Sequence, residues 1–137
     1  MNTQLSAPAQ QALNEFSACT SWEERSRLLL QWADYDKALI NAERNDSNLV
    51  VGCASAVWLQ GELIDGAWQF RIACTPNLLR GLLVLLLLRV NGLTHAELQQ
   101  FDIGDWFAQL GLSRQLSPSR SNGLYRVLQR MQLLQNQ

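Results

Sequence analysis

One nearly unbroken apolar run, "LLRGLLVLLLLRV" at residues 78–90, restricts the fold more than any other stretch of the sequence. Its uncharged part, residues 82–88, is far shorter than the ~20 residues that a membrane-spanning helix needs, and Arg80 and Arg89 bracket it. A helix that is apolar nearly all round belongs at the centre of a domain. We therefore expect a buried central helix. Arg80 and Arg89 are nine residues apart, about half a turn in phase, so their side chains should extend from opposite sides of it.

Capping and periodicity predict further helices on both sides of the central one. Thr75 and Pro76 would cap and begin the central helix, and Gly92 would end it. Ser21 and Glu24 have the spacing of a capping box at the start of an earlier helix. The apolar face of that earlier helix would consist of Leu28, Trp32, Tyr35 and Leu39. The other expected helices cover residues 6–18, 94–100, 102–111 and 117–134.

Asp65 and Gly66 stand between two runs in which apolar and polar residues alternate. This arrangement is the strongest short-range signal for a β-hairpin. It places the two strands at residues 57–63 and 67–73.

A two-residue turn also sets the register of the hairpin. It pairs Val57 with Cys74, so that Cys74 faces the same core as Val57, near the loop that enters the first strand. The predicted fold class is α+β: a small antiparallel sheet, made of this hairpin and a short third strand if one forms, packed against about six helices.

Composition excludes several classes of protein. The chain has 137 residues, 47% of them apolar, and a net charge of −1, which suits a single domain over residues 1–137 and provides no basic surface for nucleic acid or membrane partners. The first residues lack a basic start followed by an apolar stretch, so we expect a cytoplasmic protein. One histidine and three scattered cysteines lack the spacing of a metal site, and no phosphate-binding motif is present. No metal or cofactor is therefore expected in this chain.

Cys53 is the candidate reactive residue. Gly52 before it allows a sharp turn or a close approach of another backbone, and Ala54 and Ser55 after it leave the sulfur little steric cover. A thiol with the ordinary pKa of ~8.5 is only a few per cent thiolate at neutral pH, so a working thiol usually has a cation or a helix N-terminus beside it.

The other candidates have simpler explanations. Cys19 lies in a turn between two helices and suits packing. His95 falls in the first turn of a surface helix, and a hydrolase would have to bring it to Cys53. Cys74 on the inward face of the hairpin is typical of a core residue, although its nearness to Cys53 would allow a resolving or relay role.

Cys53 belongs to the stretch "GCASAVW" at residues 52–58, which resembles the G-C-x-S-x-V-W motif of the SufE/CsdE family of sulfur acceptors for cysteine desulfurases. The stretches "SWEER" at 21–25, "LLRGLLVLLL" at 78–87 and "WFAQLGLSRQLSPSRSNGL" at 106–124 also resemble that family, in the same order. The resemblance covers nearly the whole chain. It implies a SufE/IscU-like fold.

The resemblance also implies a function. In this family a cysteine desulfurase of the SufS or CsdA type holds sulfur as a persulfide, and the motif cysteine, here Cys53, takes the terminal sulfur and passes it on. The recipient is an iron-sulfur scaffold complex in the SufE branch, whereas tRNA modification has been linked to the CsdE branch, and both branches carry these motifs. Pyridoxal phosphate belongs to the desulfurase. This chain would be a partner and activator in transpersulfidation rather than a stand-alone enzyme.

Two further positions follow from the resemblance. Arg120 matches the arginine of the family's S-R-x-x-G motif, and we expect it to be a cation near Cys53 that favours the thiolate or holds a partner carboxylate, the alternative being a solvated arginine at a helix start. Where the family commonly has Ser-Asp, this chain has Cys74 and Thr75, so no role carries over there. We also expect an idle Cys53 to rest in an apolar hollow and to emerge on the partner.

Two other functions stay open at this point. One is a scaffold that assembles an iron-sulfur cluster, although clusters usually have four protein ligands and these three cysteines are not spaced as a set. The other is an interaction domain without thiol chemistry.

Overall fold

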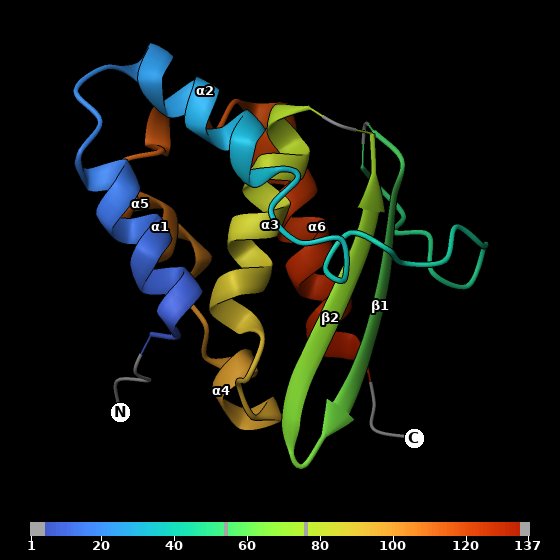
Figure 1. Ribbon diagram of the computed structural model, residues 1–137. Helices are drawn as coiled ribbons and strands as arrows, with labels where there is room; N and C mark the ends of the chain where they lie inside the picture. The colour runs from blue at the N-terminus through green and yellow to red at the C-terminus, as the bar shows by residue number, and fades with distance from the viewer. Residues whose placement is uncertain (1–4, 54, 76, 135–137) are drawn as a thin grey trace.

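Helix α3 (Leu78–Val90) lies at the centre of the fold, as its apolar sequence predicts. The computed structural model describes residues 5–53, 55–75 and 77–134. In α3, all residues from position 79 to 90 except Arg89 are buried. Helices α1 (Ala7–Ser17) and α2 (Trp22–Trp32) pack on one side of it, and the hairpin and α6 (Pro118–Leu133) pack on the other (Figure 1).

The hairpin forms in the predicted register. Strands β1 (Val57–Ile64) and β2 (Ala67–Cys74) are antiparallel, each one residue longer than predicted, and Val57 pairs with Cys74. The two turn residues, Asp65 and Gly66, have φ angles of 53° and 80°, as a two-residue hairpin turn requires. The predicted α+β class is confirmed.

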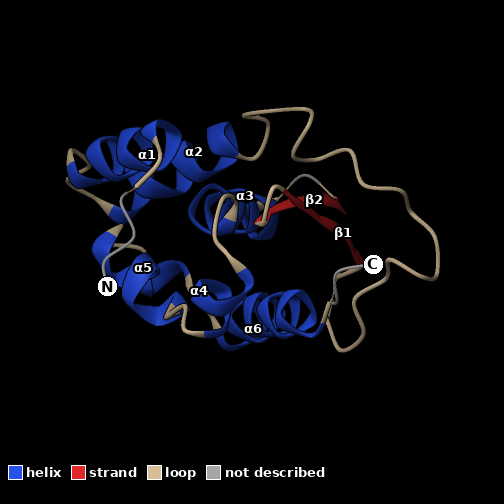
Figure 2. Cartoon of the chain, turned by 90° about the horizontal axis from the view of Figure 1, so that it is seen from below, coloured by secondary structure: helices blue, strands red, loops and turns tan. Residues whose placement is uncertain are grey.

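The third strand is reduced to a single bridge between Leu49 and Trp58, and the sheet of the described residues has two strands. Around this bridge the Val50 amide donates to the Val57 carbonyl and the Leu59 amide to the Asn48 carbonyl, each over 2.8 Å. Figure 2 shows the long loop between α2 and β1 running outside the hairpin. This loop therefore covers the edge of β1 without becoming a strand.

Helix α2 ends earlier than its apolar pattern predicts. It stops at Trp32, and Tyr35, expected on its buried face, is 40% exposed. The buried guanidinium of Arg80 takes the Ala33 carbonyl as a hydrogen-bond acceptor, over 3.0 Å, and forms an ion pair with Asp34. These contacts with α3 hold the residues after Trp32 in a turn.

The central helix also begins at a different residue than predicted. Its N-cap is Asn77, whose side chain accepts from the Arg80 amide over 2.9 Å, so Thr75 does not cap it. Asparagine is among the best N-cap residues, which explains the choice. Pro76 lies outside the described residues. Gly92 follows the helix with a φ of 96°, as predicted for its C-terminal end.

The other helices follow their capping signals. Thr94 and Glu97 form a full capping box at α4 (His95–Gln99), and Asp102 caps α5 (Ile103–Gln109). The chain then enters a short 3₁₀ helix, η1 (Ser113–Gln115), which was not predicted from the sequence, before α6. At α2, the Ser21 hydroxyl accepts from the Glu24 amide, whereas the Glu24 carboxylate accepts from the side chains of Thr20 and Ser21.

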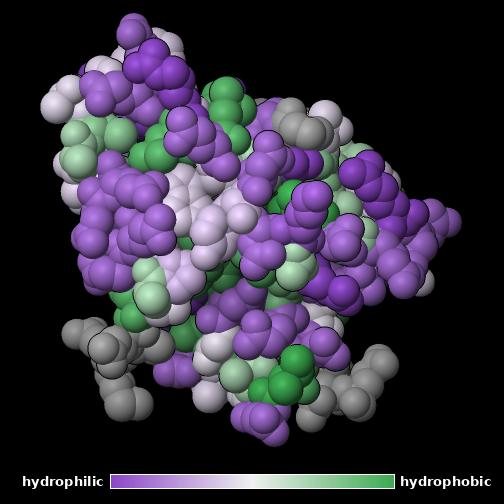
Figure 3. All heavy atoms as spheres, viewed as in Figure 1, coloured by the Kyte–Doolittle hydropathy of each residue, from purple (hydrophilic) through white to green (hydrophobic). Residues whose placement is uncertain are grey.

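Seven large apolar side chains are exposed among the residues that the structure describes. On the face shown in Figure 3, hydrophilic residues predominate and hydrophobic ones are scattered. Among the exposed apolar residues, Val51 is 81% exposed, two positions before Cys53.

Candidate functional site

The segment of residues 47–53, called the Cys53 loop from here on, is held against helix α6. Gly52 has a φ of 95°, a left-handed conformation that side chains rarely adopt. The Asn122 side chain donates to the Gly52 carbonyl over 2.9 Å, and the Cys53 Sγ donates to the Gly123 carbonyl over 3.8 Å. The predicted sharp turn at Gly52 is confirmed, and it directs the thiol toward α6.

Arg130 holds the beginning of the same loop. Its guanidinium donates to the Ser47 carbonyl over 2.6 Å and to the Leu49 carbonyl over 3.1 Å. Asn122, Arg126 and Arg130 are spaced four residues apart and so form one row along α6. This spacing is a signal in the sequence, but only the fold shows that the row faces the Cys53 loop.

The Cys53 thiol is half-buried at the edge of the core. Burial raises the pKa of this thiol above its ordinary value, and the nearby Arg126 guanidinium lowers it in part. A Cβ placed on Gly52 would lie 3.0 Å from the Arg126 Nε, which shows how close this cation is to the loop. Cys53 is therefore mainly a thiol at neutral pH, with a cation available to stabilise the thiolate.

Arg120 lies in the first turn of α6, before the row of residues that holds the Cys53 loop. With Ser55, Asn77 and Ser117 it lines a hollow of about 380 Å³ between the starts of α3 and α6. Its guanidinium donates to the Gln115 carbonyl over 3.2 Å. The positive charge that lowers the pKa of Cys53 belongs to Arg126, which the sequence analysis did not select. The expected role of Arg120, as a cation near Cys53 or a contact for a partner carboxylate, stays a prediction. Ala54 lies outside the described residues.

The other two thiols differ in position. Cys74 is 1% exposed, and burial raises its pKa, with Arg80 acting in the opposite direction and Cys53 adding to the rise. Cys19 follows α1 and donates to the Glu15 carbonyl over 3.6 Å. The structure thus brings Cys74, and not Cys19, into electrostatic contact with Cys53.

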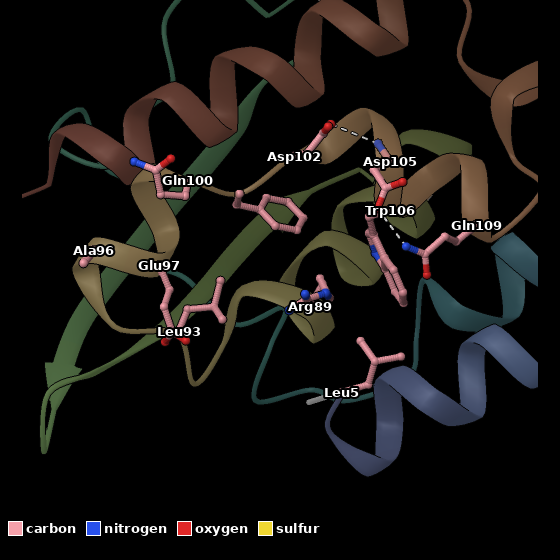
Figure 4. Close-up of a pocket in the computed structure, with 11 residues that line it drawn as sticks. Leu5, Arg89, Leu93, Ala96, Glu97, Gln100, Asp102, Asp105, Trp106 and Gln109 are labelled. Carbon is pink, nitrogen blue, oxygen red and sulfur yellow. Dashed lines mark hydrogen bonds between the residues drawn. The ribbon is translucent and has the colours of Figure 1, made fainter. Parts of the chain in front are cut away.

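A hollow larger than the one beside Arg120 lies at the opposite end of α3. Its volume is about 610 Å³, and its lining includes Arg89, Phe101 and Trp106 (Figure 4). Arg89 lies over the Phe101 ring, 5.6 Å from its centroid. A helix rises 1.5 Å per residue, so about 16 Å separates Leu78, which lines the hollow with Arg120, from Arg89. This hollow is separate from the thiol site.

Two other kinds of structure are missing from the described part of the chain. Residues 5–53, 55–75 and 77–134 contain no group of three or more His, Cys, Asp or Glu side chains placed to hold a metal ion. Within the same ranges, no helix combines the length and apolar character needed to cross a membrane.

The fold and the site define a class of protein that presents one cysteine on a loop bound to the last helix of a small α+β structure. The family model "SufE: Fe-S metabolism associated domain" matches residues 10–135. The chain belongs to the SufE family, which is associated with iron-sulfur metabolism, so the resemblance is confirmed. The solution structure of a hypothetical protein from Thermus thermophilus is similar, with a TM-score of 0.68 and 20% identity over 94% of this chain and 93% of that chain. This likeness shows that the two share a fold.

Proposed function

We propose that this protein accepts sulfur from a cysteine desulfurase as a persulfide on Cys53 and delivers it for iron-sulfur cluster assembly or for tRNA or cofactor thiolation. The observation that carries the proposal is the placement of Cys53, on a tight loop beside a cation and next to an exposed apolar residue. Arg126 supplies the cation, and Val51 supplies the exposed side chain. The pyridoxal phosphate belongs to the desulfurase, which would be of the SufS or CsdA type.

The transfer is a thiol exchange reaction. The Cys53 thiolate attacks the outer sulfur of the persulfide on the desulfurase, a new sulfur-sulfur bond forms on Cys53, and the desulfurase cysteine leaves as a thiolate. Arg126 would stabilise the attacking thiolate, and the proton from Cys53 passes to solvent. The reaction needs no metal and no general base from this chain.

Access to the partner requires Cys53 to leave its position on α6. The thiol rests against the Gly123 carbonyl, and the loop is held by Asn122 and Arg130. These are few and partly exposed hydrogen bonds, which cost little to break when a partner replaces them. Arg120, in the adjoining hollow, would then contact a partner carboxylate.

Intact-mass measurement after mixing with a desulfurase and cysteine tests the proposal. We expect one added sulfur atom that is removed by reductant, located on Cys53 by peptide mapping, and absent from Cys53→Ser. Cys19→Ser serves as the matched control, because Cys19 lies in the turn after α1 and should leave loading unchanged. An unmodified Cys53 beside an active desulfurase would refute the proposal.

Desulfurase activity separates a sulfur carrier from a simple interaction domain. A carrier with Cys53→Ser would bind the desulfurase but no longer stimulate it. An interaction domain would still stimulate it with the same substitution. Arg120→Ala should weaken partner binding, and unchanged affinity and transfer would remove Arg120 from the site.

A further inference from the structure

The chain near Cys53 meets the chain near Cys74 at two points. Val57, four residues after Cys53, pairs with Cys74 at the end of the hairpin, and both side chains are buried. Residues paired across strands have Cβ atoms about 4.5–5.5 Å apart. Ser55 and Asn77, which follow Cys53 and Cys74 by two and three positions, line the same hollow.

Both cysteines contact the same hydrophobic core. Cys74 belongs to the buried cluster, and Cys53 packs against that cluster. Each thiol is also within electrostatic reach of the other, since Cys53 contributes to the raised pKa of Cys74.

We propose that Cys74 is a resolving thiol, which discharges a persulfide on Cys53 as hydrogen sulfide and leaves a disulfide between the two cysteines. This inference rests on the proposed function, because it requires Cys53 to carry an added sulfur. The Cys74 thiolate attacks the inner sulfur of the persulfide, and the bond between the inner and outer sulfur atoms breaks. The outer sulfur leaves with the electron pair and takes up the proton released by Cys74. The Cys74 sulfur is oxidised to the level of the disulfide, which the Cys53 sulfur has already reached in the persulfide, and the outer sulfur is reduced to sulfide.

The burial of Cys74 sets the rate of this step. Burial raises its pKa, the Arg80 and Arg44 guanidinium groups lower it in part, and Cys53 raises it again. Near neutral pH the thiolate is scarce, so discharge is slow and a partner has time to take the sulfur first. Persulfides that no partner collects are released as sulfide, and a dithiol reductant then restores both thiols.

Chemical loading tests the inference without a desulfurase. The full chain with Cys19→Ser is treated with inorganic polysulfide, which transfers one sulfur to the Cys53 thiolate, and is then desalted. We expect the chain that is heavier by one sulfur to convert into a species lighter than the reduced chain by two hydrogen atoms. Sulfide is released in equal amount, and peptide mapping finds Cys53 joined to Cys74. The conversion is faster at pH 9 than at pH 7.

Substitution of Cys74 provides the control. Cys74→Ser in the same background should keep its persulfide, and Cys74→Ala replaces it if a buried hydroxyl prevents folding. Equal persulfide lifetimes with and without Cys74, or no Cys53–Cys74 disulfide in the chain that retains both, would overturn the inference. Sulfur loading of Cys53 by a desulfurase is measured in a separate experiment, and a failure there counts against the proposed function alone.

Discussion

The Asn122 side chain donates a hydrogen bond to the Gly52 carbonyl over 2.9 Å and so joins the Cys53 loop to helix α6 across 70 positions of sequence. Next to it the Cys53 thiol donates to the Gly123 carbonyl. Cys53 and the glycine before it are therefore held by neighbouring residues of one helix, and the accessibility of the thiol depends on how firmly they hold it.

Asn122→Ala should make Cys53 more accessible. The substitution removes a hydrogen bond worth about 1 kcal/mol, which corresponds to an increase of about fivefold in the alkylation rate of Cys53. The rate is measured at a pH where the thiol is fully ionised, so that only access changes. Gln129→Ala, at an exposed position of the same helix, is the control and should leave the rate unchanged. Equal rates for both variants would show that this bond does not hold the loop.

Arg126→Gln should shift the pH dependence of Cys53 alkylation to higher pH. Burial raises the pKa of the Cys53 thiol and Arg126 opposes the rise, so removing this charge leaves less thiolate at any given neutral pH. The midpoint of the alkylation profile measures the effect. Arg120→Gln removes a cation from the same helix and should move the midpoint less. A larger shift with Arg120→Gln would assign the electrostatic role to Arg120 instead.

Gly52→Ala and Gly66→Ala should both strain the backbone, but only Gly52→Ala should also disturb the surroundings of Cys53. Both glycines have positive φ, so each alanine should cost about 1–2 kcal/mol of unfolding free energy in urea titrations. Gly66 has open space around it, whereas a Cβ on Gly52 meets the Arg126 Nε at 3.0 Å. Only Gly52→Ala should therefore change the alkylation of Cys53, and a similar change in Gly66→Ala would contradict this account.

Gly81→Ala should destabilise the fold although alanine favours helices. A Cβ at position 81 would lie 2.4 Å from the Leu29 carbonyl oxygen, so α2 and α3 would have to separate, at a cost of about 3 kcal/mol. Gly104→Ala in α5 is the control, because its closest contact is 3.4 Å, and alanine there should be neutral or stabilising by up to ~1 kcal/mol. Thermal unfolding of both variants checks the difference.

The local elements of this fold were predictable from short stretches of sequence. A two-residue turn at Asp65 and Gly66 leaves one register for the strands beside it, and that register is observed. The helix starts after Thr94, Asp102 and Ser117 also agree, because a capping side chain bonds to an amide two or three residues away.

Arg80 is involved in two boundaries that were predicted wrongly. Its guanidinium contacts the residues that end α2, and its amide donates to the Asn77 side chain that caps α3. Its guanidinium reaches the Ala33 carbonyl, the Asp34 carboxylate and the Cys74 carbonyl, which belong to segments far apart in sequence. A buried guanidinium must satisfy its donors, and it does so at the end of α2. Periodicity over a short window contains no information on such a contact, so the apolar pattern extended α2 beyond Trp32.

The candidate site also has features that the local sequence predicts and features that depend on the tertiary structure. The residues around Cys53 and the motif they form already indicate a reactive thiol, because small neighbours and a flexible glycine are local properties of the chain. The cation beside that thiol and the bonds that hold its loop come from Arg126, Asn122 and Arg130, about 70 to 80 positions later. Helical spacing puts these three side chains in one row, but only the packing of α6 against α3 turns that row toward Cys53, since the burial of the whole apolar core decides which face of a helix meets which loop.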